Sequence, residues 1–206
     1  MKPIYSFLYI LCFVFIFISC KNDSDKSNGE SVIKEIKKTE AIIKKEPKVL
    51  TEQEKKVIGS LLNKSMKTPE SKSFVSAIVS AGLTKILSDQ DGPFTVFAPS
   101  NNVFNSLDKE NKKRLFNTKN KDSLIIFINS LIVEGSYTMD DLKTEIKNNG
   151  GKLTMKSLSG STLIASKKGK SIIIKDENGN KATIEKGDIT ATNGVLHIID
   201  AMIVFD

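Results

Sequence analysis

Apolar residues recur every three or four positions in the middle of the chain and alternate with polar ones after residue 150. Thr51, with Glu54 three residues later, predicts the start of a helix that carries Val57, Ile58, Leu61 and Leu62. A second helix is predicted over Ser73–Leu87, and its apolar face holds Phe74, Ile78, Val79, Leu83 and Leu87. A third is predicted from Asn102. A fourth, over Ser123–Leu131, is apolar almost all round and should be buried.

Strands are predicted where runs rich in β-branched residues are bounded by Gly, Asn and Lys. The predicted strands are Phe94–Ala98, Leu153–Leu158, Thr162–Lys167, Ser171–Lys175, Ala182–Glu185 and Gly194–Phe205. Asn178-Gly179 between two of these runs predicts a tight hairpin. Helices first and strands later indicate an α+β domain with helices packed on one side of the sheets.

The N-terminal residues predict export. An unbroken apolar run from Ile4 to Ile18 follows a single positive charge at Lys2, as in a secretory signal peptide over residues 1–19. A membrane-spanning anchor is the alternative, but the run is shorter than the ~20 residues that a spanning helix needs. Ser19-Cys20 at its end resembles a bacterial lipoprotein cleavage site, which implies that Cys20 becomes the lipidated first residue. The alternative is an ordinary cysteine beside a removed peptide.

Residues 20–50 are therefore expected to be a lipidated cysteine and a flexible tether, because they are rich in Lys, Glu, Asp, Ser and Asn and contain no aromatic residue. The folded domain is expected over residues 51–206. Cys12 lies inside the removed peptide, so the mature chain keeps only Cys20 and has neither an internal disulfide nor a cysteine metal site. The expected location is the cell envelope, lipid-anchored in the outer membrane and facing either the cell surface or the periplasm.

The formal net charge of +7 does not by itself indicate nucleic-acid binding. Arg114 is the only arginine, whereas phosphate and base recognition favour the planar fork of arginine. Lysines are interspersed with acidic residues, as in residues 34–40. We therefore expect no nucleic-acid partner, and the lysine-rich surface leaves room for attraction to anionic lipid or acidic polysaccharide.

Two apolar segments about a hundred residues apart carry a resemblance to a known family. The first runs from Thr95 to Ser100 and the second from Asn193 to Asp200, with Asp188-Ile189 shortly before it. Together they resemble the two conserved stretches of the fasciclin domain, an extracellular adhesion and interaction module. The resemblance implies helices packed against a two-sheet β-wedge or sandwich, with structural roles for the matching residues Thr95, Phe97, Ala98, Pro99, Asn193, Gly194, His197 and Asp200.

The chain departs from this family at one place. Where the family usually has a Tyr-His pair shortly before a glycine, this chain has Ser130-Leu131. The integrin-binding mode linked to that pair in some animal members is therefore not expected here. Asp188-Ile189 matches the Asp-Ile pair of another adhesion motif in the family, which makes these two residues the candidate interaction site. The competing interpretation is a strand start or a turn cap.

Catalysis is not expected. His197 is the only histidine, and it lies in an apolar strand between Val195 and Ile199, which favours a hydrogen-bonded core histidine over a base or a metal ligand. A Ser-His-Asp triad would depend on this one residue. The sequence indicates no metal site and no cofactor, and the paired acids Asp140-Asp141 indicate the start of a helix, where negative charge is favoured. A lectin site built on stacked aromatics is also disfavoured, because the chain has no tryptophan and Tyr137 is the only tyrosine after the signal peptide.

The sequence thus predicts a non-catalytic envelope lipoprotein that mediates adhesion or matrix interaction, with an extracellular protein or an acidic polysaccharide as partner. The alternative is a periplasmic small-ligand or cofactor-binding protein. The two hypotheses differ in the site they require, because a ligand binder needs a deep apolar pocket with converging polar groups. The sequence leaves the oligomeric state open.

Overall fold

The computed structural model describes residues 49–116 and 121–203. Lipidation at Cys20, the signal peptide and nearly all of the tether therefore lie outside the described residues. The elements are α2 (Glu52–Gly59), α3 (Leu61–Lys67), η1 (Pro69–Ser71), α4 (Lys72–Ala81), α5 (Thr84–Ser88), β1 (Phe94–Pro99), α6 (Asn101–Ser106), α7 (Lys109–Leu115), α8 (Lys121–Ser130), β2 (Ile132–Glu134), α9 (Met139–Asn148), β3 (Lys152–Lys156), β4 (Thr162–Lys168), β5 (Ser171–Lys175), β6 (Lys181–Ala191) and β7 (Gly194–Ile199).

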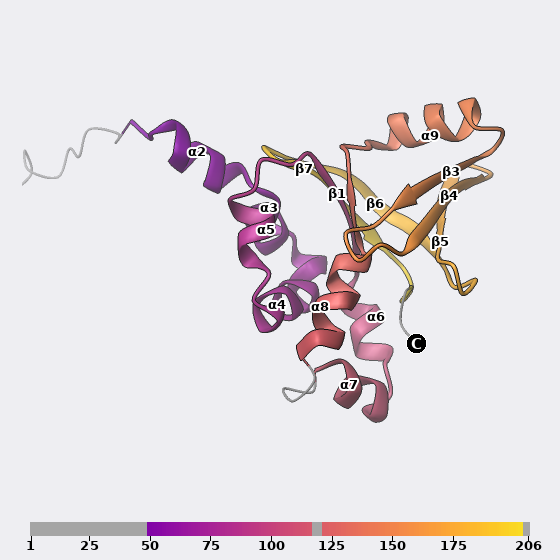
Figure 1. Cartoon of the computed structure of the whole chain (residues 1–206), viewed down its shortest axis with the longest axis horizontal. Helices are drawn as coiled ribbons and strands as arrows, with labels where there is room; N and C mark the ends of the chain where they lie inside the picture. The colour runs from indigo at the N-terminus through magenta and orange to yellow at the C-terminus, as the bar shows by residue number, and fades with distance from the viewer. Residues whose placement is uncertain (1–48, 117–120, 204–206) are drawn as a thin grey trace, which may run out of the picture. The chain divides into compact units, whose positions relative to one another are not determined.

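The strands pair in the order β2-β1-β7-β6-β5-β4-β3 (Figure 1). The β1–β7 pair is parallel and the other pairs are antiparallel. The long strand β6 joins the two halves, because it pairs with β7 along one part and with β5 along another. A bridge between Val133 and Ser157 brings the two edge strands together, so the sheet is nearly closed. The expected α+β class, with helices against a two-part sheet, is confirmed.

The helices cover the sheet in two groups. Helix α3 packs on β6 and β7, α8 packs on β2, and α4 packs between these two helices, whereas α9 packs on β3, β4 and β5 (Figure 1). Phe74 of α4, Phe97 of β1 and Leu196 of β7 are fully buried in the first group. Beneath α9 the buried side chains include Leu142, Ile146, Leu163, Ile172 and Ile174. Full burial of a large apolar side chain contributes about 1.5–3 kcal/mol, so these residues supply much of the stability.

Two predicted helices are each broken by a local cap. The helix that begins at Thr51 has the expected capping box with Glu54, but it ends at Gly59, and extended Ser60 caps a new helix through its hydroxyl. The helix predicted over Ser73–Leu87 ends at Ala81, because Gly82 adopts a left-handed conformation with φ of 73°. Its predicted apolar face was also wrong at Val79, whose side chain is 58 % exposed.

Helix α2 is also unusual in that it contains no buried residue. Val57 and Ile58 remain 38 % and 43 % exposed. Thr192 holds its last turn: the hydroxyl donates to the Lys56 carbonyl and the amide donates to the Gly59 carbonyl, both at 2.9 Å.

The remaining differences from the prediction concern the strands and α8. Helix α8 is not buried all round, since Ile126 is 59 % exposed. Strand β2 and helix α7 were not predicted, because Ile132-Val133 continues the apolar run of α8 and α7 is almost wholly polar. Strand β6 extends to Ala191 past two irregularities in its register that interrupt the alternation. The last strand ends at Ile199, and Phe205 lies outside the described residues.

Candidate functional site

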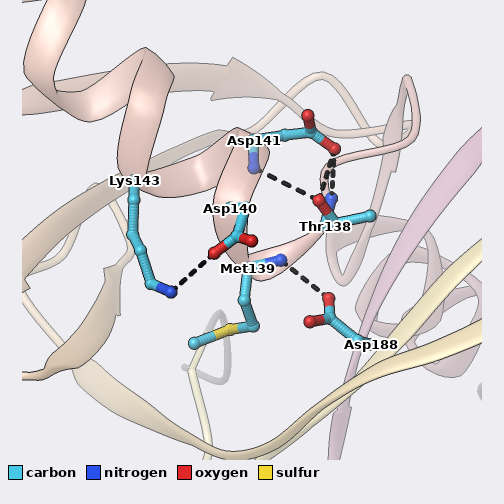
Figure 2. A network of polar contacts seen from close by, with 6 residues as sticks. All are labelled: Thr138, Met139, Asp140, Asp141, Lys143 and Asp188. Carbon is cyan, nitrogen blue, oxygen red and sulfur yellow. Dashed lines mark hydrogen bonds and ion pairs between the residues drawn. The ribbon is translucent and has the colours of Figure 1, made fainter.

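Asp188 lies at an irregular point of β6 and faces the first turn of α9. The register with β7 shifts between Lys186 and Ile189, and Asp188 adopts a positive φ of 59°. Its carboxylate Oδ1 accepts a hydrogen bond of 2.7 Å from the Met139 amide (Figure 2). Helix N-termini present unpaired amides and a partial positive charge, so a carboxylate is stabilising there. Asp188 therefore serves as a cap from a distant strand, and its side chain is otherwise exposed.

The start of α9 carries its own cap beside Asp188. Thr138 and Asp141 form a capping box, in which the Thr138 hydroxyl accepts from the Asp141 amide and the Asp141 carboxylate accepts from the Thr138 amide. The hydrogen bonds from the Thr138 hydroxyl and amide lower the pKa of Asp141. Asp140 pairs with Lys143 at 2.7 Å (Figure 2). Three carboxylates thus gather at the N-terminal end of α9, as the paired acids in the sequence had indicated for a helix start.

Ile189, the second member of the candidate pair, has a different environment. It is paired opposite Leu196 and packs, partly buried, against the core. Gly187 on the other side of Asp188 is closely covered, because a Cβ there would lie 2.6 Å from Met139 Cγ and 3.1 Å from His197 Nδ1. The structure therefore leaves the carboxylate of Asp188 as the accessible part of this pair. Sequence reasoning missed Gly187 and Met139, although Gly187 directly precedes the matched pair.

His197 links the same region to the centre of the sheet. Its side chain is fully buried and stacks on Phe97, with ring centroids 5.7 Å apart. Nδ1 accepts from the Asp188 amide at 3.3 Å, and Nε2 lies 2.7 Å from the Tyr137 carbonyl oxygen. Because Nδ1 accepts, the proton is on Nε2, which donates to Tyr137. This is the arrangement of a neutral histidine in a core.

Thr95 extends this network to β1. Its hydroxyl donates to the Gly135 carbonyl at 2.7 Å and accepts from the Tyr137 amide at 2.9 Å. The side chains of Thr95, His197 and Asp188 thus hold residues 135–139 from three strands. We call this set the α9 anchor. Its geometry fixes a segment that presents the acidic end of α9 at the surface.

The protonation of His197 should make stability depend on pH. Burial lowers the pKa of His197, and the Tyr137 carbonyl and Asp188 offset only part of this. The unfolded chain, with a pKa near 6.5, then binds the proton at a higher pH than the folded chain does. The free energy of unfolding should therefore fall as pH drops below about 6.5, by at most about 1.4 kcal/mol per pH unit. Urea titrations at several pH values measure this slope.

His197→Gln is the matched control, because glutamine keeps a donor and an acceptor but does not titrate. Since His197 is the only histidine, the difference between the two stability curves isolates its contribution. Parallel curves between pH 5 and 8 would contradict the assignment of a neutral His197.

The other residues of the fasciclin resemblance secure the junction of β1 and β7. Phe97, Ala98 and Pro99 of β1 are opposite His197, Ile198 and Ile199, and the strand ends at the proline. Asn193 is buried, and its side chain bonds to Leu61, Leu87 and Gln90. The carboxylate of Asp200 accepts from the Thr183 amide at 2.5 Å. Gly194 lies directly against the backbone of Phe94.

Ser130 and Leu131 occupy the place of the family Tyr-His pair. Leu131 is fully buried, and the Ser130 hydroxyl lies 2.7 Å from the Ser159 hydroxyl. Ser159 in turn bonds to the hydroxyls of Ser157 and Ser161, at 2.9 and 2.8 Å. This serine cluster lies where β2 meets the end of β3, so Ser130 helps to join the two edges of the sheet. The three serines of the 157–161 segment are the only local signal for this cluster in the sequence.

No metal cluster appears in the part of the chain that the structure describes: these residues contain no group of three or more His, Cys, Asp and Glu side chains suited to an ion. Nor does any described helix have the length and apolar character required to span a membrane.

Hollows of about 250 to 450 Å³ lie on the described surface, and Lys, Glu, Thr and Asn line much of them.

The domain is of the α+β class. Its seven-stranded sheet is nearly closed, and Thr95, His197 and Asp188 hold the start of α9 against it. The model of the fasciclin domain matches residues 69–205, so the chain belongs to the fasciclin domain family. The same fold occurs in a FAS1 domain pair from the insect cell adhesion molecule Fasciclin I, with a TM-score of 0.63 and 17 % identity over 70 % of this chain and 50 % of that one. The fasciclin domain is a general adhesion-related module.

Similar curated sequences include Protein sll1483 of Synechocystis sp., 34 % identical over 131 residues, which are 63 % of this chain and 64 % of that protein. The transforming growth factor-beta-induced protein ig-h3 of Sus scrofa is 33 % identical over 63 % of this chain and 17 % of its own length. Human periostin is 25 % identical over 63 % of this chain and 14 % of its own length. The chain thus spans less than two thirds of each of these relatives.

Proposed function

We propose that this protein is a non-catalytic binding module of the cell envelope, held by a lipid on Cys20 and mediating adhesion or interaction with extracellular protein or matrix. Membership of the fasciclin domain family carries the proposal. The N-terminal residues support the anchor, since Ser19-Cys20 directly follows the apolar run from Ile4 to Ile18. A flexible tether over residues 20–50 would hold the domain away from the bilayer.

The described surface supports binding of a large partner over capture of a small apolar ligand. The hollow beside α2 is lined by Glu52, Gln53, Lys55, Lys56 and Thr192, and a further one near β1 is lined mainly by polar residues. Small-molecule sites are typically lined by apolar and aromatic side chains with a few polar groups. The polar character of these hollows favours adhesion over the alternative of a periplasmic ligand or cofactor binder.

Replacing Cys20 with alanine is expected to move the protein from the membrane fraction to the soluble fraction, because the acyl chains that anchor it cannot be attached. Each buried CH₂ of an acyl chain contributes ~0.8 kcal/mol, so several chains on one cysteine hold the protein firmly and their loss should be nearly complete. Fractionation and labelling with a radioactive fatty acid measure the effect.

Cys12→Ala is the matched control, because Cys12 lies within the apolar run and should leave fractionation unchanged. The same strains test adhesion: deletion of the gene should lower attachment of cells to one another or to a surface, and only the wild-type and Cys12→Ala proteins should restore it. Normal attachment after deletion of the gene would contradict the adhesion proposal. Membrane association of the Cys20→Ala protein would show that a lipid on Cys20 is not the anchor.

A further inference from the structure

Positive charge is concentrated in one part of the fold. Residues 143–181 contain nine lysines and only Glu145, Asp176 and Glu177 as acids, which is a formal charge of +6 out of the +7 of the whole chain. This segment comprises most of α9 and strands β3, β4 and β5. Lysines and acidic residues alternate in residues 34–40, whereas lysines clearly outnumber acidic residues in residues 143–181.

A hollow of about 450 Å³ lies within this segment, between α9 and the end of β4. Its lining residues are Lys143, Thr144, Ile146, Lys147, Gly151 and Lys167. Lys143 and Lys147 are four residues apart on α9 and so share one face of the helix. Lys167 follows the buried Leu163 and Ala165 at alternate positions of β4, which places it on the face of the sheet that α9 covers.

The hollow is electrostatically unbalanced. None of its lining residues is acidic. Lys143 is neutralised in part by Asp140, whose own side chain is 89 % exposed. Lys147 and Lys167 form no ion pair with the residues that the structure describes. Two uncompensated ammonium groups and a third nearby therefore border one concave surface.

We propose that this hollow binds the carboxylate or sulfate groups of an acidic polysaccharide. The inference rests on the proposed function and names the partner class and its site. Each lysine presents a compact positive charge with three donors on a flexible stem, which attracts such groups, and Thr144 adds a hydroxyl. Lys152, Lys156 and Lys168 alternate with the residues of β3 and β4 that face α9, so they lie on the other face of the sheet and the proposed site is the hollow itself.

The lining favours polysaccharide over the other common polyanions. Single-stranded nucleic acid is generally held by aromatic stacking, and no aromatic side chain lines the hollow. The one arginine, Arg114, lies on α7 and not among the lining residues. A bilayer surface is broad, whereas these lysines surround a concave site.

The test compares the full-length chain in mild detergent with the double variant Lys147→Gln, Lys167→Gln. The probes are alginate, which carries carboxylates, dextran sulfate, neutral dextran and duplex DNA. We expect the wild-type chain to bind alginate or dextran sulfate but not neutral dextran, with weaker binding at higher salt. The double variant should bind at least tenfold more weakly. Lys113→Gln, on the exposed face of α7, is the control and should change the affinity less than twofold.

Several results would overturn the site. These are no binding of either acidic polysaccharide, equal weakening by Lys113→Gln, or tighter binding of DNA than of polysaccharide. An unchanged melting temperature of the double variant shows that lost binding is not lost folding. The attachment assay decides separately on the proposed function: attachment that needs the protein, together with failure to bind polysaccharide, overturns the site and leaves adhesion standing.

Discussion

Replacing Gly194 with alanine is expected to lower the free energy of unfolding by about 4 kcal/mol, the largest effect of any single substitution considered for this domain. Gly194 has φ of 149°, a conformation that side-chain-bearing residues rarely adopt, and a Cβ built there would overlap the Phe94 carbonyl oxygen. The contact is backbone against backbone at the start of the β1–β7 pair, so neither partner can move aside. Strain and overpacking each contribute about 1–3 kcal/mol. Urea denaturation measures the loss.

Gly169→Ala is the matched control for this prediction. Gly169 also has a positive φ, of 62°, but no atom lies within 4 Å of a Cβ placed on it. Only the backbone conformation should matter there, at a cost of about 1–2 kcal/mol. Similar losses for the two alanine variants would show that the close approach of Gly194 to Phe94 does not contribute.

Asn193→Ala is expected to cost about 3 kcal/mol, because it removes the shared partner of three segments. The side-chain oxygen of Asn193 accepts from the Leu61 amide at 2.8 Å, and its amide donates to the Leu87 and Gln90 carbonyls at 3.2 and 3.1 Å. The bonds to Leu61 and Leu87 are buried, so water cannot replace Asn193 there. A buried polar group that loses its partner costs about 1–3 kcal/mol.

Asn101→Ala provides the comparison for Asn193. Asn101 also accepts from an amide, that of Ser73 at 2.9 Å, and donates to the Pro69 carbonyl at 2.8 Å, but its bond to Pro69 is exposed. Water can therefore compensate in part, and the expected loss is about 1 kcal/mol. Equal losses for Asn101→Ala and Asn193→Ala would contradict the role given to burial.

Much of the fold could be predicted from local sequence. The capping box at Thr51, the acidic start of α9 and the proline at the end of β1 each depend on residues within a few positions of one another. The breaks at Ser60 and Gly82 were missed because helical spacing continues across them, whereas the local caps favour a new start and a stop. Strand β2 was missed because three residues are too few for an alternation to show.

The candidate site was less predictable because its contacts join distant parts of the chain. Asp188-Ile189 could be matched by resemblance, but the Met139 amide that Asp188 caps is 49 residues away. Similarly, Ser130 is 29 residues from Ser159, and sheet closure brings them together. The lysine-lined hollow depends on which face of β4 lies under α9, and alternation alone cannot say which helix covers that face.

If the protein is anchored at its N-terminal side as proposed, helix α2 has a mechanical consequence. When the N-terminal side is pulled while a partner holds the rest of the domain, the stretching force acts on α2 before it reaches the sheet. Stretching its eight residues from ~1.5 Å to ~3.4 Å per residue would add about 15 Å of length. No buried side chain of α2 would be exposed in this step, and the bonds broken would be the hydrogen bonds of the helix, those from Thr192 and the exposed ion pair of Lys56 with Asp91. The helix is thus an extensible link in series with a stiffer sheet, so the force on a bound partner would rise gradually as cells are pulled apart.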